Sequence, residues 1–569
     1  MSTSRGSQVV RIGIIGAGPA GLAALKTVLD TPQYKAGQWI PTVLEAREDV
    51  GGVWLPSDLL SNPRGASSKD KVPPTPLYDS LTTNLPHPVM AFSSYSFPPG
   101  TPLFPRAAAV RAYLADFASH FNLTPYIRFN TRVQSVGWDA GTRRWAVEVS
   151  APLGNGSIRE ERHEFDMVLV CNGHHNVPRY PLVPGLQAWL DACLAIHSIF
   201  YRNPTASIPI SDILHSTILV VGDGPSGQDV TSDLLGVAGK VILSSSANVS
   251  VPPNHSNENA STTSIVNKPR ASNFDLEHKT ATFTDGTSEK IDYCILATGY
   301  EVDFPFFNQD VQPNDAVSLS KFHLPKSLSS KIDIDSKHLT NSTWSVAPLV
   351  RHIIPFPGFA SSNLISSLDE SSPSPTSIAF LGLLVRVAPL PLLECQARAA
   401  LAAFAHPSTM NSQWEKEERA LSKRKETLVG KFQARPLEDS TAQTTTSTHQ
   451  LEAFISQQWQ RFEDEEQFAY RDALDVLAHE LSLPHPHAAQ SAALESEQPH
   501  KTKSWERELY ARKGPLRAAW RALEASGEAP KWVDGVGRGE SRGPDGTLHT
   551  PEEEWVELMW RVLAWGEMK

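Results

Sequence analysis

The first residues whose types and spacing indicate chemistry are three glycines near the start of the chain. Gly16-Ala17-Gly18-Pro19-Ala20-Gly21 fills the pattern G-x-G-x-x-G directly after the β-branched run 9–15. In this pattern the first glycine permits a tight turn, the second lets the backbone approach a pyrophosphate, and the third allows a helix to pack closely on a strand. The start of the following helix adds free N–H groups and the positive end of its dipole. The spacing therefore predicts that these six residues bind a dinucleotide.

A carboxylate and a second pair of glycines follow at a spacing that fits the same site. Glu45 ends the apolar run 42–44, where a carboxylate accepts hydrogen bonds from the hydroxyls of an adenosine ribose. An acid at this point favours FAD or NAD over a coenzyme with a 2′-phosphate. Gly51-Gly52-Val53-Trp54 comes next. Alone it indicates a turn with a core tryptophan, but after the ribose acid it predicts a backbone that passes beside a flavin.

The same glycine pattern occurs a second time. Gly222-Asp223-Gly224-Pro225-Ser226-Gly227 follows the run 217–221, and Gln228 and Asp229 continue the helix. Two such sites indicate two bound dinucleotides, which a flavin reduced by a nicotinamide needs and a simple dehydrogenase does not. The phosphate preference of the second site stays open. Ser244-Ser245-Ser246 offers neither an acid for a ribose diol nor an arginine for a 2′-phosphate.

Short apolar strands and helical patterns alternate around both glycine turns. Strands are predicted at 9–15, 42–44 and 166–171 around the first turn, and at 217–221, 240–243 and 290–297 around the second. The expected fold class is α/β, with two Rossmann-like dinucleotide-binding domains, the NADP domain inserted in a split FAD domain, plus a mostly helical C-terminal extension. The expected domains are 8–176 and 300–430 for FAD, 177–299 for NAD(P), and 431–569 for the extension.

Three stretches are expected to be loops, because they are rich in Ser, Thr, Pro and other polar residues: 361–376, 435–449 and 485–503. The last residues, ELMWRVLAWGEMK, predict an amphipathic helix that packs on the protein. No chemical motif occurs after residue 450, and the role of the segment after Arg398 stays open between a cover over the substrate entrance and an oligomer interface.

Composition and charge limit the classes of protein. The chain has 569 residues, too many for one ordinary core, and 40% of them are hydrophobic. Its net charge of −11 argues against nucleic-acid binding, which needs a basic face. The four cysteines form no C-x-x-C pair, which indicates a reducing compartment, the cytoplasm, and no metal site. No signal peptide is expected, because the first residues, MSTSRGSQVV, contain no apolar stretch of the kind that such a peptide needs. No membrane span is expected either, because the apolar stretch 378–393 is interrupted by Arg386 and two prolines.

With these motifs in order, the chain resembles the flavin-containing monooxygenases, the N- and S-oxygenating branch of the two-dinucleotide monooxygenases. The resemblance runs from about Arg11 to Arg398. It rests on seven ordered segments: GAGPAGL at 16–22, E-x-x-x-x-x-G-G-x-W at 45–54, LYDSLTTNLP at 77–86, VLVCNGHHNVPRYPLVPGL at 168–186, GDGPSGQD at 222–229, LATGYEVDFPF at 296–306, and AFLGLL with PLPLLECQAR, which ends at 398.

The resemblance implies an enzyme with FAD and NADPH as cofactors and with dioxygen and a small molecule as substrates. NADPH would reduce the flavin, dioxygen would add to give a 4a-hydroperoxide, and its distal oxygen would pass to a soft nucleophile, nitrogen or sulfur. It also implies that Asn84 is catalytic and lies at the flavin and nicotinamide, with Thr83 in contact with one of them. The other interpretation of Asn84 is that it caps a turn before Leu85-Pro86.

The chain departs from the family at its identifying motif, F-x-G-x-x-x-H-x-x-x-Y/F. His197 and Tyr201 fit the second half, but Asp191 and Cys193 stand where Phe and Gly are expected. Tyr201 favours this branch over the Baeyer–Villiger oxygenases of ketones. His197 is interpreted as shaping the region between the domains, because a lone histidine beside apolar residues is more often structural than catalytic.

Three alternatives remain. A Baeyer–Villiger oxygenase would share the flavin chemistry. A pyridine-nucleotide disulfide oxidoreductase would need a redox cysteine pair, which the sequence lacks. A non-catalytic nucleotide-sensing scaffold would use the helical C-terminal third to dock a partner.

Overall fold

The structure is a computed structural model. It describes residues 9–57, 75–153, 157–245, 263–307, 324, 338–359, 372–435, 444–482, 501–543 and 546–569.

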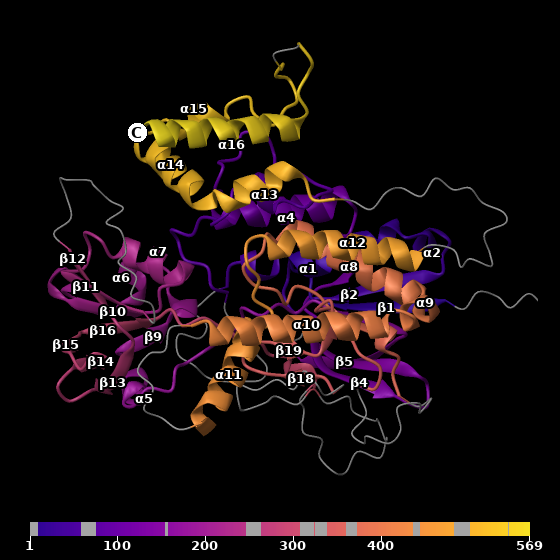
Figure 1. Ribbon diagram of the computed structural model, residues 1–569, viewed down its shortest axis with the longest axis horizontal. Helices are drawn as coiled ribbons and strands as arrows, with labels where there is room; N and C mark the ends of the chain where they lie inside the picture. The colour runs from indigo at the N-terminus through magenta and orange to yellow at the C-terminus, as the bar shows by residue number, and fades with distance from the viewer. Residues whose placement is uncertain are drawn as a thin grey trace, which may run out of the picture.

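A five-stranded parallel sheet organises the first glycine turn. Its strand order is β22-β7-β1-β2-β3, with bounds Ile378–Phe380, Met167–Val170, Val10–Ile15, Trp39–Leu44 and Ile127–Arg128. The strands are short apolar runs, and the last four residues of β1 are buried, as expected of strands covered on both faces. Helices α1 (Pro19–Asp30), α8 (Pro389–Ala405) and α12 (Glu466–Ser482) lie together over one face of this sheet (Figure 1).

A second five-stranded parallel sheet organises the second turn. Its order is β12-β11-β10-β16-β9, with bounds Ser264–Lys268, Lys240–Ser244, Thr217–Val221, Tyr293–Leu296 and Ala195–His197. Helix α7 (Pro225–Asp233) follows β10. All five strands come from residues between β7 and β22, which pair with each other in the first sheet. The predicted fold class, with one dinucleotide-binding domain inserted in another, is confirmed; the residue boundaries of the domains stay a prediction.

Smaller elements complete the two domains. Two antiparallel sheets are formed by β4 (Arg132–Asp139), β5 (Arg144–Pro152) and β6 (Ile158–Phe165), and by β13 (Ala271–Asp275), β14 (Thr280–Phe283) and β15 (Ser288–Lys290). The short pairs are β8 (Val177–Pro178) with β17 (Tyr300–Glu301), β18 (Thr340–Asn341) with β19 (Val346–Ala347), and β20 (Leu349–Val350) with β21 (Ile354–Pro355). The remaining helices here are α2 (Pro32–Lys35), α3 (His87–Met90), α4 (Ala107–His120), α5 (Leu186–Asp191) and α6 (Pro204–Ser207).

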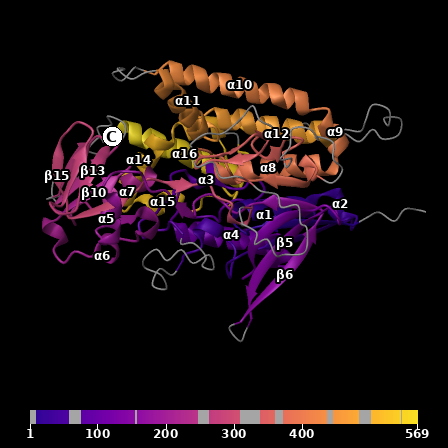
Figure 2. The same ribbon diagram turned by 90° about the horizontal axis from the view of Figure 1, so that it is seen from below.

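The C-terminal region is helical, as predicted, and it packs into the first domain. Its helices after α8 are α9 (Pro407–Asn411), α10 (Trp414–Gln433), α11 (Thr444–Gln458), α12, α13 (Ser504–Ala511), α14 (Lys513–Ala525), α15 (Ala529–Val533) and α16 (Pro551–Met568). Apolar side chains of α13, α14 and α16 share one continuous core with α1, α4 and β1. The ring of His87 in α3 lies 4.3 Å from that of Trp555 in α16, and the two helices are next to each other in Figure 2. Figure 1 shows α14 and α16 on one side of the molecule, next to α13 and α4, and the shared core makes this region part of the fold.

The three predicted loops have different outcomes. Most of 361–376 and 485–503 lies outside the described residues. The loop predicted at 435–449 is wrong from Thr444 onward, where α11 begins. Polar composition misled the prediction, because the helix is stabilised further along by packing of Leu451 and Ile455 against Leu428. Among the described residues, no helix is both long and apolar enough to cross a bilayer.

Candidate dinucleotide sites

The first glycine turn has a geometry that only glycine satisfies. Gly16 has a φ of +99°, and a Cβ there would lie 2.8 Å from the carbonyl oxygen of Cys171 at the end of β7. A Cβ on Gly21 would lie 1.8 Å from the carbonyl oxygen of Gly16. Helix α1 begins at Pro19, which is suited to the first helical turn because it lacks a backbone N–H. The turn therefore presents the start of α1 at the carboxyl edge of the sheet, the place where a diphosphate binds.

The second pair of glycines lies directly against this turn. The Gly51 N–H donates to the carbonyl oxygen of Ala17 (3.1 Å). A Cβ on Gly18 would lie 3.3 Å from Gly52 Cα. Gly52 begins a 3₁₀ turn that includes the half-buried residues Val53 and Trp54. The structure thus brings the predicted segments 16–21 and 51–54 together.

Glu45 lies at the same edge, at the end of β2. Its side chain is buried, and it accepts the N–H groups of Ala17 (2.6 Å) and Arg47 (2.9 Å). Burial raises the pKa of the Glu45 carboxyl, although these N–H groups act in the opposite direction. The predicted ribose acid is therefore held at the first turn by the turn's own backbone.

The second glycine turn repeats the first. Gly222 has a φ of +109°, and a Cβ there would lie 2.3 Å from the carbonyl oxygen of Ala297. A Cβ on Gly227 would lie 1.9 Å from the carbonyl oxygen of Gly222. Around Gly224, by contrast, a Cβ would meet no atom within 4 Å. The turn is open where the backbone would approach a pyrophosphate.

The polar residues of the second motif have different partners. Gln228 is exposed and donates to the carbonyl oxygen of Asp223 (3.1 Å), and Ser226 is half-buried. The Ser244 hydroxyl at the end of β11 donates to the Pro269 carbonyl oxygen (2.9 Å) and accepts the Ala271 N–H (3.1 Å). The Ser244 hydroxyl therefore stabilises the backbone of the segment that follows β12.

Asp229 connects three parts of the chain. It accepts the hydroxyl proton of Tyr78 (2.7 Å), a residue of the segment before α3. From α14, Arg517 and Arg521 approach the same carboxylate at 3.6 and 3.4 Å. Burial raises the pKa of the Tyr78 hydroxyl, and the charge of Asp229 raises it further. Sequence reasoning missed this contact, because the segments are far apart in the chain and carry no joint motif.

Thr83 and Asn84 lie just before α3. The buried Thr83 hydroxyl donates to the carbonyl oxygen of Leu85 (2.8 Å), and its N–H donates to that of Pro105 (3.0 Å). The Asn84 side chain is exposed and makes no hydrogen bond to any described residue. It therefore caps no turn within the described chain.

His197 is held in a structural role. Its Nε2–H donates to the carbonyl oxygen of Gly299 (3.0 Å), and its Nδ1 accepts the Ile199 N–H (3.2 Å). Burial lowers the pKa of His197 to about 4, so the ring is neutral near pH 7. The ring joins β9 to the segment that returns to the first domain.

Arg202 adds a second connection between the domains. Its guanidinium donates to the carbonyl oxygens of Ile199 (3.0 Å) and Tyr201 (2.7 Å) in the inserted domain and to that of Thr75 (3.1 Å) in the first. The segment that begins at Thr75 is thereby held against the inserted domain.

Two glycine turns of the same geometry, each at the edge of its own parallel sheet and the first with a buried acid, define a protein that binds two dinucleotides. The model of the family described as flavin-binding monooxygenase-like matches residues 9–274 and 254–335, more than half of the chain. The chain belongs to this family. The description of this family as flavin-binding agrees with FAD as the cofactor predicted for the first turn.

Individual relatives agree with the family. The chain is 31% identical to the flavin-containing monooxygenase FMO GS-OX-like 9 of Arabidopsis thaliana over 313 residues, which are 53% of this chain and 64% of that protein. It is 29% identical to the thiol-specific monooxygenase of Saccharomyces cerevisiae over 308 residues, 53% of this chain and 63% of that protein. The chain thus spans less than two thirds of the length of these relatives.

Solved structures share the fold. The S-allyl-L-cysteine S-oxygenase from Allium sativum superimposes with a TM-score of 0.60 at 20% identity, covering 92% of this chain and 99% of that one. Tmm from Pelagibacter sp. strain HTCC7211 has a TM-score of 0.57 at 19% identity, covering 90% and 92%.

Proposed function

We propose that this protein is an NADPH-dependent monooxygenase that transfers one oxygen atom of dioxygen to a soft nucleophile of a small molecule, by way of the flavin 4a-hydroperoxide that the family resemblance implies. The observation that carries the proposal is the pair of glycine turns with matching geometry, 16–21 and 222–227, in two sheets of one chain. Two dinucleotide sites are needed when one cofactor reduces the other.

Sulfur is the first nucleophile to test. The printed names of a thiol-specific monooxygenase and an S-oxygenase among the similar proteins favour it over nitrogen. A thioether or thiol is also polarizable and uncharged, which suits attack on an electrophilic oxygen.

The proposed roles of the residues follow from their positions. The turn 16–21, with Glu45, Val53 and Trp54, would hold FAD. The turn 222–227 would hold the NADPH diphosphate at the start of α7, where backbone N–H groups face outward. Asn84, with its exposed amide, and the neighbouring Thr83 would lie at the reacting rings, where an uncharged group that both donates and accepts stabilises the oxygenated flavin.

Residues 8–176 and 300–430 are proposed as the FAD domain, 177–299 as the NADP domain and 431–569 as the extension. Arg517 and Arg521 of the extension contact Asp229 of the NADP domain. The extension would therefore help to exclude water from the oxygenated flavin, since water promotes loss of hydrogen peroxide.

The test is stopped-flow absorbance on the FAD-loaded protein. Reduction with NADPH and with NADH is followed first, and the reduced protein is then mixed with oxygen in the presence of a sulfide and an amine. We expect faster reduction by NADPH, a lasting hydroperoxide-like band, and oxygen transfer to the sulfide. Immediate reoxidation to hydrogen peroxide with every substrate would contradict the proposal and the role of Asn84.

A matched pair of variants separates binding from folding. Gly224→Ala places a methyl group in open space at the proposed diphosphate site, whereas Gly430→Ala places one in open space on α10, far from any dinucleotide motif. We expect Gly224→Ala alone to slow reduction by NADPH, while both proteins retain FAD.

A further inference from the structure

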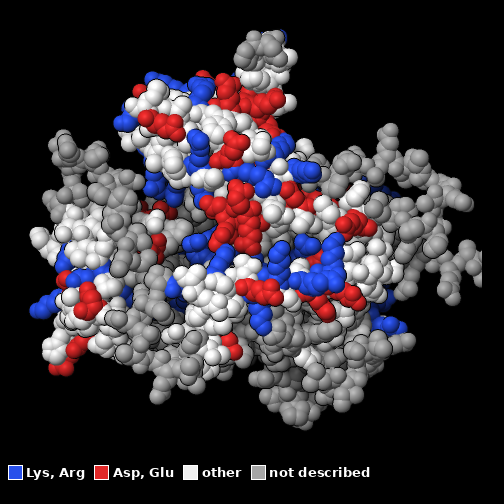
Figure 3. All heavy atoms as spheres, in the orientation of Figure 1, with Lys and Arg blue, Asp and Glu red and all other residues white. Residues whose placement is uncertain are grey.

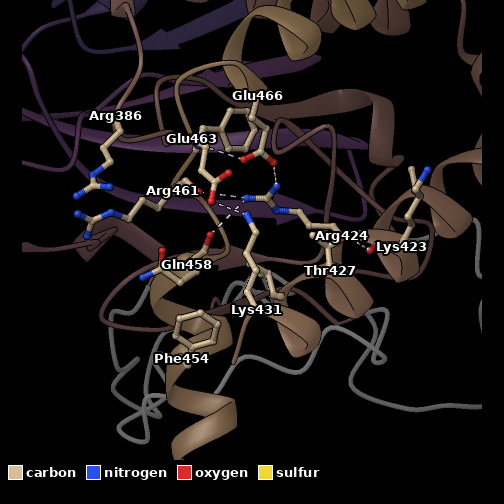
Figure 4. A pocket seen from close by; sticks show the side chains of 13 residues that line it. Arg386, Lys423, Arg424, Thr427, Lys431, Phe454, Gln458, Arg461, Glu463 and Glu466 are labelled. Atoms are coloured by element: carbon tan, nitrogen blue, oxygen red, sulfur yellow. Dashed lines mark hydrogen bonds and ion pairs between the residues drawn. The ribbon is translucent and has the colours of Figure 1, made fainter. Parts of the chain in front are cut away.

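A cavity of about 290 Å³ lies away from both glycine turns, between α10, α11 and the segment that joins α11 to α12. Its volume is at the lower end of those of small-molecule sites. Five of its lining side chains are Lys or Arg and two are Glu, and Leu428, Phe454 and Phe462 supply apolar surface. Figure 4 shows Arg424, Lys431, Glu463 and Glu466 turned toward one another, with Arg386 and Arg461 together to one side of them.

Two of the basic side chains are already neutralised. Arg424 forms an ion pair with Glu466 and also donates to the carbonyl oxygen of Trp459 (2.9 Å). Lys431 lies 2.7 Å from Glu463. Both carboxylates of the cavity are thereby engaged, which leaves the charges of Arg386, Arg461 and Lys423 without an acid in the cavity.

The backbone holds Arg386 and Arg461 side by side. The Val385 N–H donates to the carbonyl oxygen of Gln460 (3.0 Å), and the Phe462 N–H donates to that of Val385 (3.2 Å), so Arg461 is bridged to the residue before Arg386. Figure 4 shows the two guanidinium groups next to each other. Neither forms an ion pair with any described residue. Burial, and then the charge of Arg386, lower the pKa of Arg461.

Two like charges lie side by side here, on the exposed Arg386 and the half-buried Arg461. Arg386 also has a φ of +63°, a left-handed conformation that residues with side chains rarely adopt. Strain and repulsion that coincide at a cavity indicate a function that requires them.

We propose that Arg386 and Arg461 bind the phosphate group of a small organic molecule. The two positive charges of the guanidinium groups are balanced by the two negative charges of a phosphate dianion. The planar N–H donors of each guanidinium also form paired hydrogen bonds to phosphate oxygens. The apolar lining residues would contact the organic part of the ligand. On the face seen in Figure 3, basic and acidic side chains are interspersed over α10 and α12, so the surface offers no continuous basic track for a polyanion.

The test is calorimetric titration of the holoenzyme, saturated with FAD and NADP⁺ so that the dinucleotide phosphate sites are filled. Inorganic phosphate and phenyl phosphate are titrated at about pH 8, where both are dianions. We expect one site per chain, with tighter binding of phenyl phosphate. Arg386→Gln and Arg461→Gln should each raise the Kd about tenfold or more. Arg419→Gln removes an exposed arginine of α10 outside the cavity, and it should leave the Kd unchanged.

A measurement without ligand supports the same assignment. Because each substitution relieves repulsion, Arg386→Gln and Arg461→Gln should melt no lower than the wild type. The proposal is overturned by absence of binding, by binding that persists in both variants, or by an equal loss in Arg419→Gln. Succinate bound as tightly as phosphate would overturn the assignment of a phosphate. None of these outcomes bears on the oxygenase activity, because the cavity is separate from the glycine turns.

Discussion

The two glycine turns have the same backbone geometry at their first and third glycines, but the residues that surround them differ. In both, the third glycine lies against the carbonyl oxygen of the first, at 1.8 and 1.9 Å for an added Cβ. The first turn is enclosed by Gly51, Gly52 and the buried Glu45. The second is open at Gly224, and its acid, Asp229, is bound by Tyr78 and two arginines. An enclosed site suits a cofactor that stays bound, and an open site suits a coenzyme that exchanges.

The largest expected effect tests what the turns share. Gly21→Ala and Gly227→Ala each place a Cβ in steric clash with a backbone oxygen, at 1.8 and 1.9 Å. Each should therefore destabilise its own domain by about 4 kcal/mol or more. Gly21→Ala is expected to lose FAD, and Gly227→Ala to lose reduction by NADPH. Thermal unfolding and flavin absorbance measure both. Two stable, flavin-loaded variants would show that the shared geometry is dispensable.

The next effect tests Glu45, the buried carboxylate whose partner is the backbone of the first turn. In Glu45→Gln, an amide NH₂ replaces one of the two carboxylate oxygens that accept backbone N–H groups. A donor then faces a donor, so the free energy of unfolding should fall by about 1–3 kcal/mol, and FAD should bind more weakly. Ser244→Ala should leave FAD binding intact. Equilibrium unfolding and flavin titration of both variants separate the two sites.

Glu45 also predicts a pH dependence. Burial raises the pKa of its carboxyl in the folded protein, so its contribution to folding is fully present below the unfolded value near 4.5 and is lost as the pH rises through the raised pKa. FAD affinity should change in the opposite sense and fall on acidification, because a protonated carboxyl accepts fewer hydrogen bonds. Flavin titration against pH measures this, and a dependence that persists in Glu45→Gln would assign it to another group.

A smaller effect tests the openness of the second turn. Gly224→Ala should raise the KM for NADPH about tenfold with little change in unfolding, since its Cβ meets no protein atom. Gly18→Ala should instead weaken FAD and cost some stability, because its Cβ lies 3.3 Å from Gly52 Cα. Steady-state kinetics and unfolding of the pair decide this. Equal KM values in Gly224→Ala and the wild type would place the diphosphate elsewhere.

The smallest effect tests the connection that only the second turn has. Tyr78→Phe removes the hydroxyl that donates to Asp229, and it should cost about 1 kcal/mol of stability and raise the KM for NADPH a few fold while FAD binding is unchanged. Tyr201→Phe, which removes a hydroxyl that donates to Asp233 at 3.2 Å, is the matched comparison. If FAD is lost instead, Tyr78 supports the first turn and not the second.

The sequence by itself determined the parts of the fold that local patterns encode. Strands β1, β2, β7, β10, β11 and β16 lie where short apolar runs predicted them, because such runs are buried on both faces of a parallel sheet. The glycine turns were predictable from spacing, because the third glycine of each lies against the carbonyl oxygen of the first, five residues earlier in the same turn. The roles of Thr83 and Asn84 stay a prediction that comes from the resemblance to a family.

Only the tertiary structure decided which distant residues meet. Asp229 was predicted as part of a coenzyme motif, and nothing in the sequence placed Tyr78, Arg517 and Arg521 beside it. Arg386 and Arg461 are adjacent because Val385 bonds to the backbone of residues 460 and 462. Helix α11 begins at Thr444, inside the loop predicted at 435–449, because apolar residues further along it pack on α10. Such contacts depend on the relative placement of elements, which periodicity and spacing along the chain do not encode.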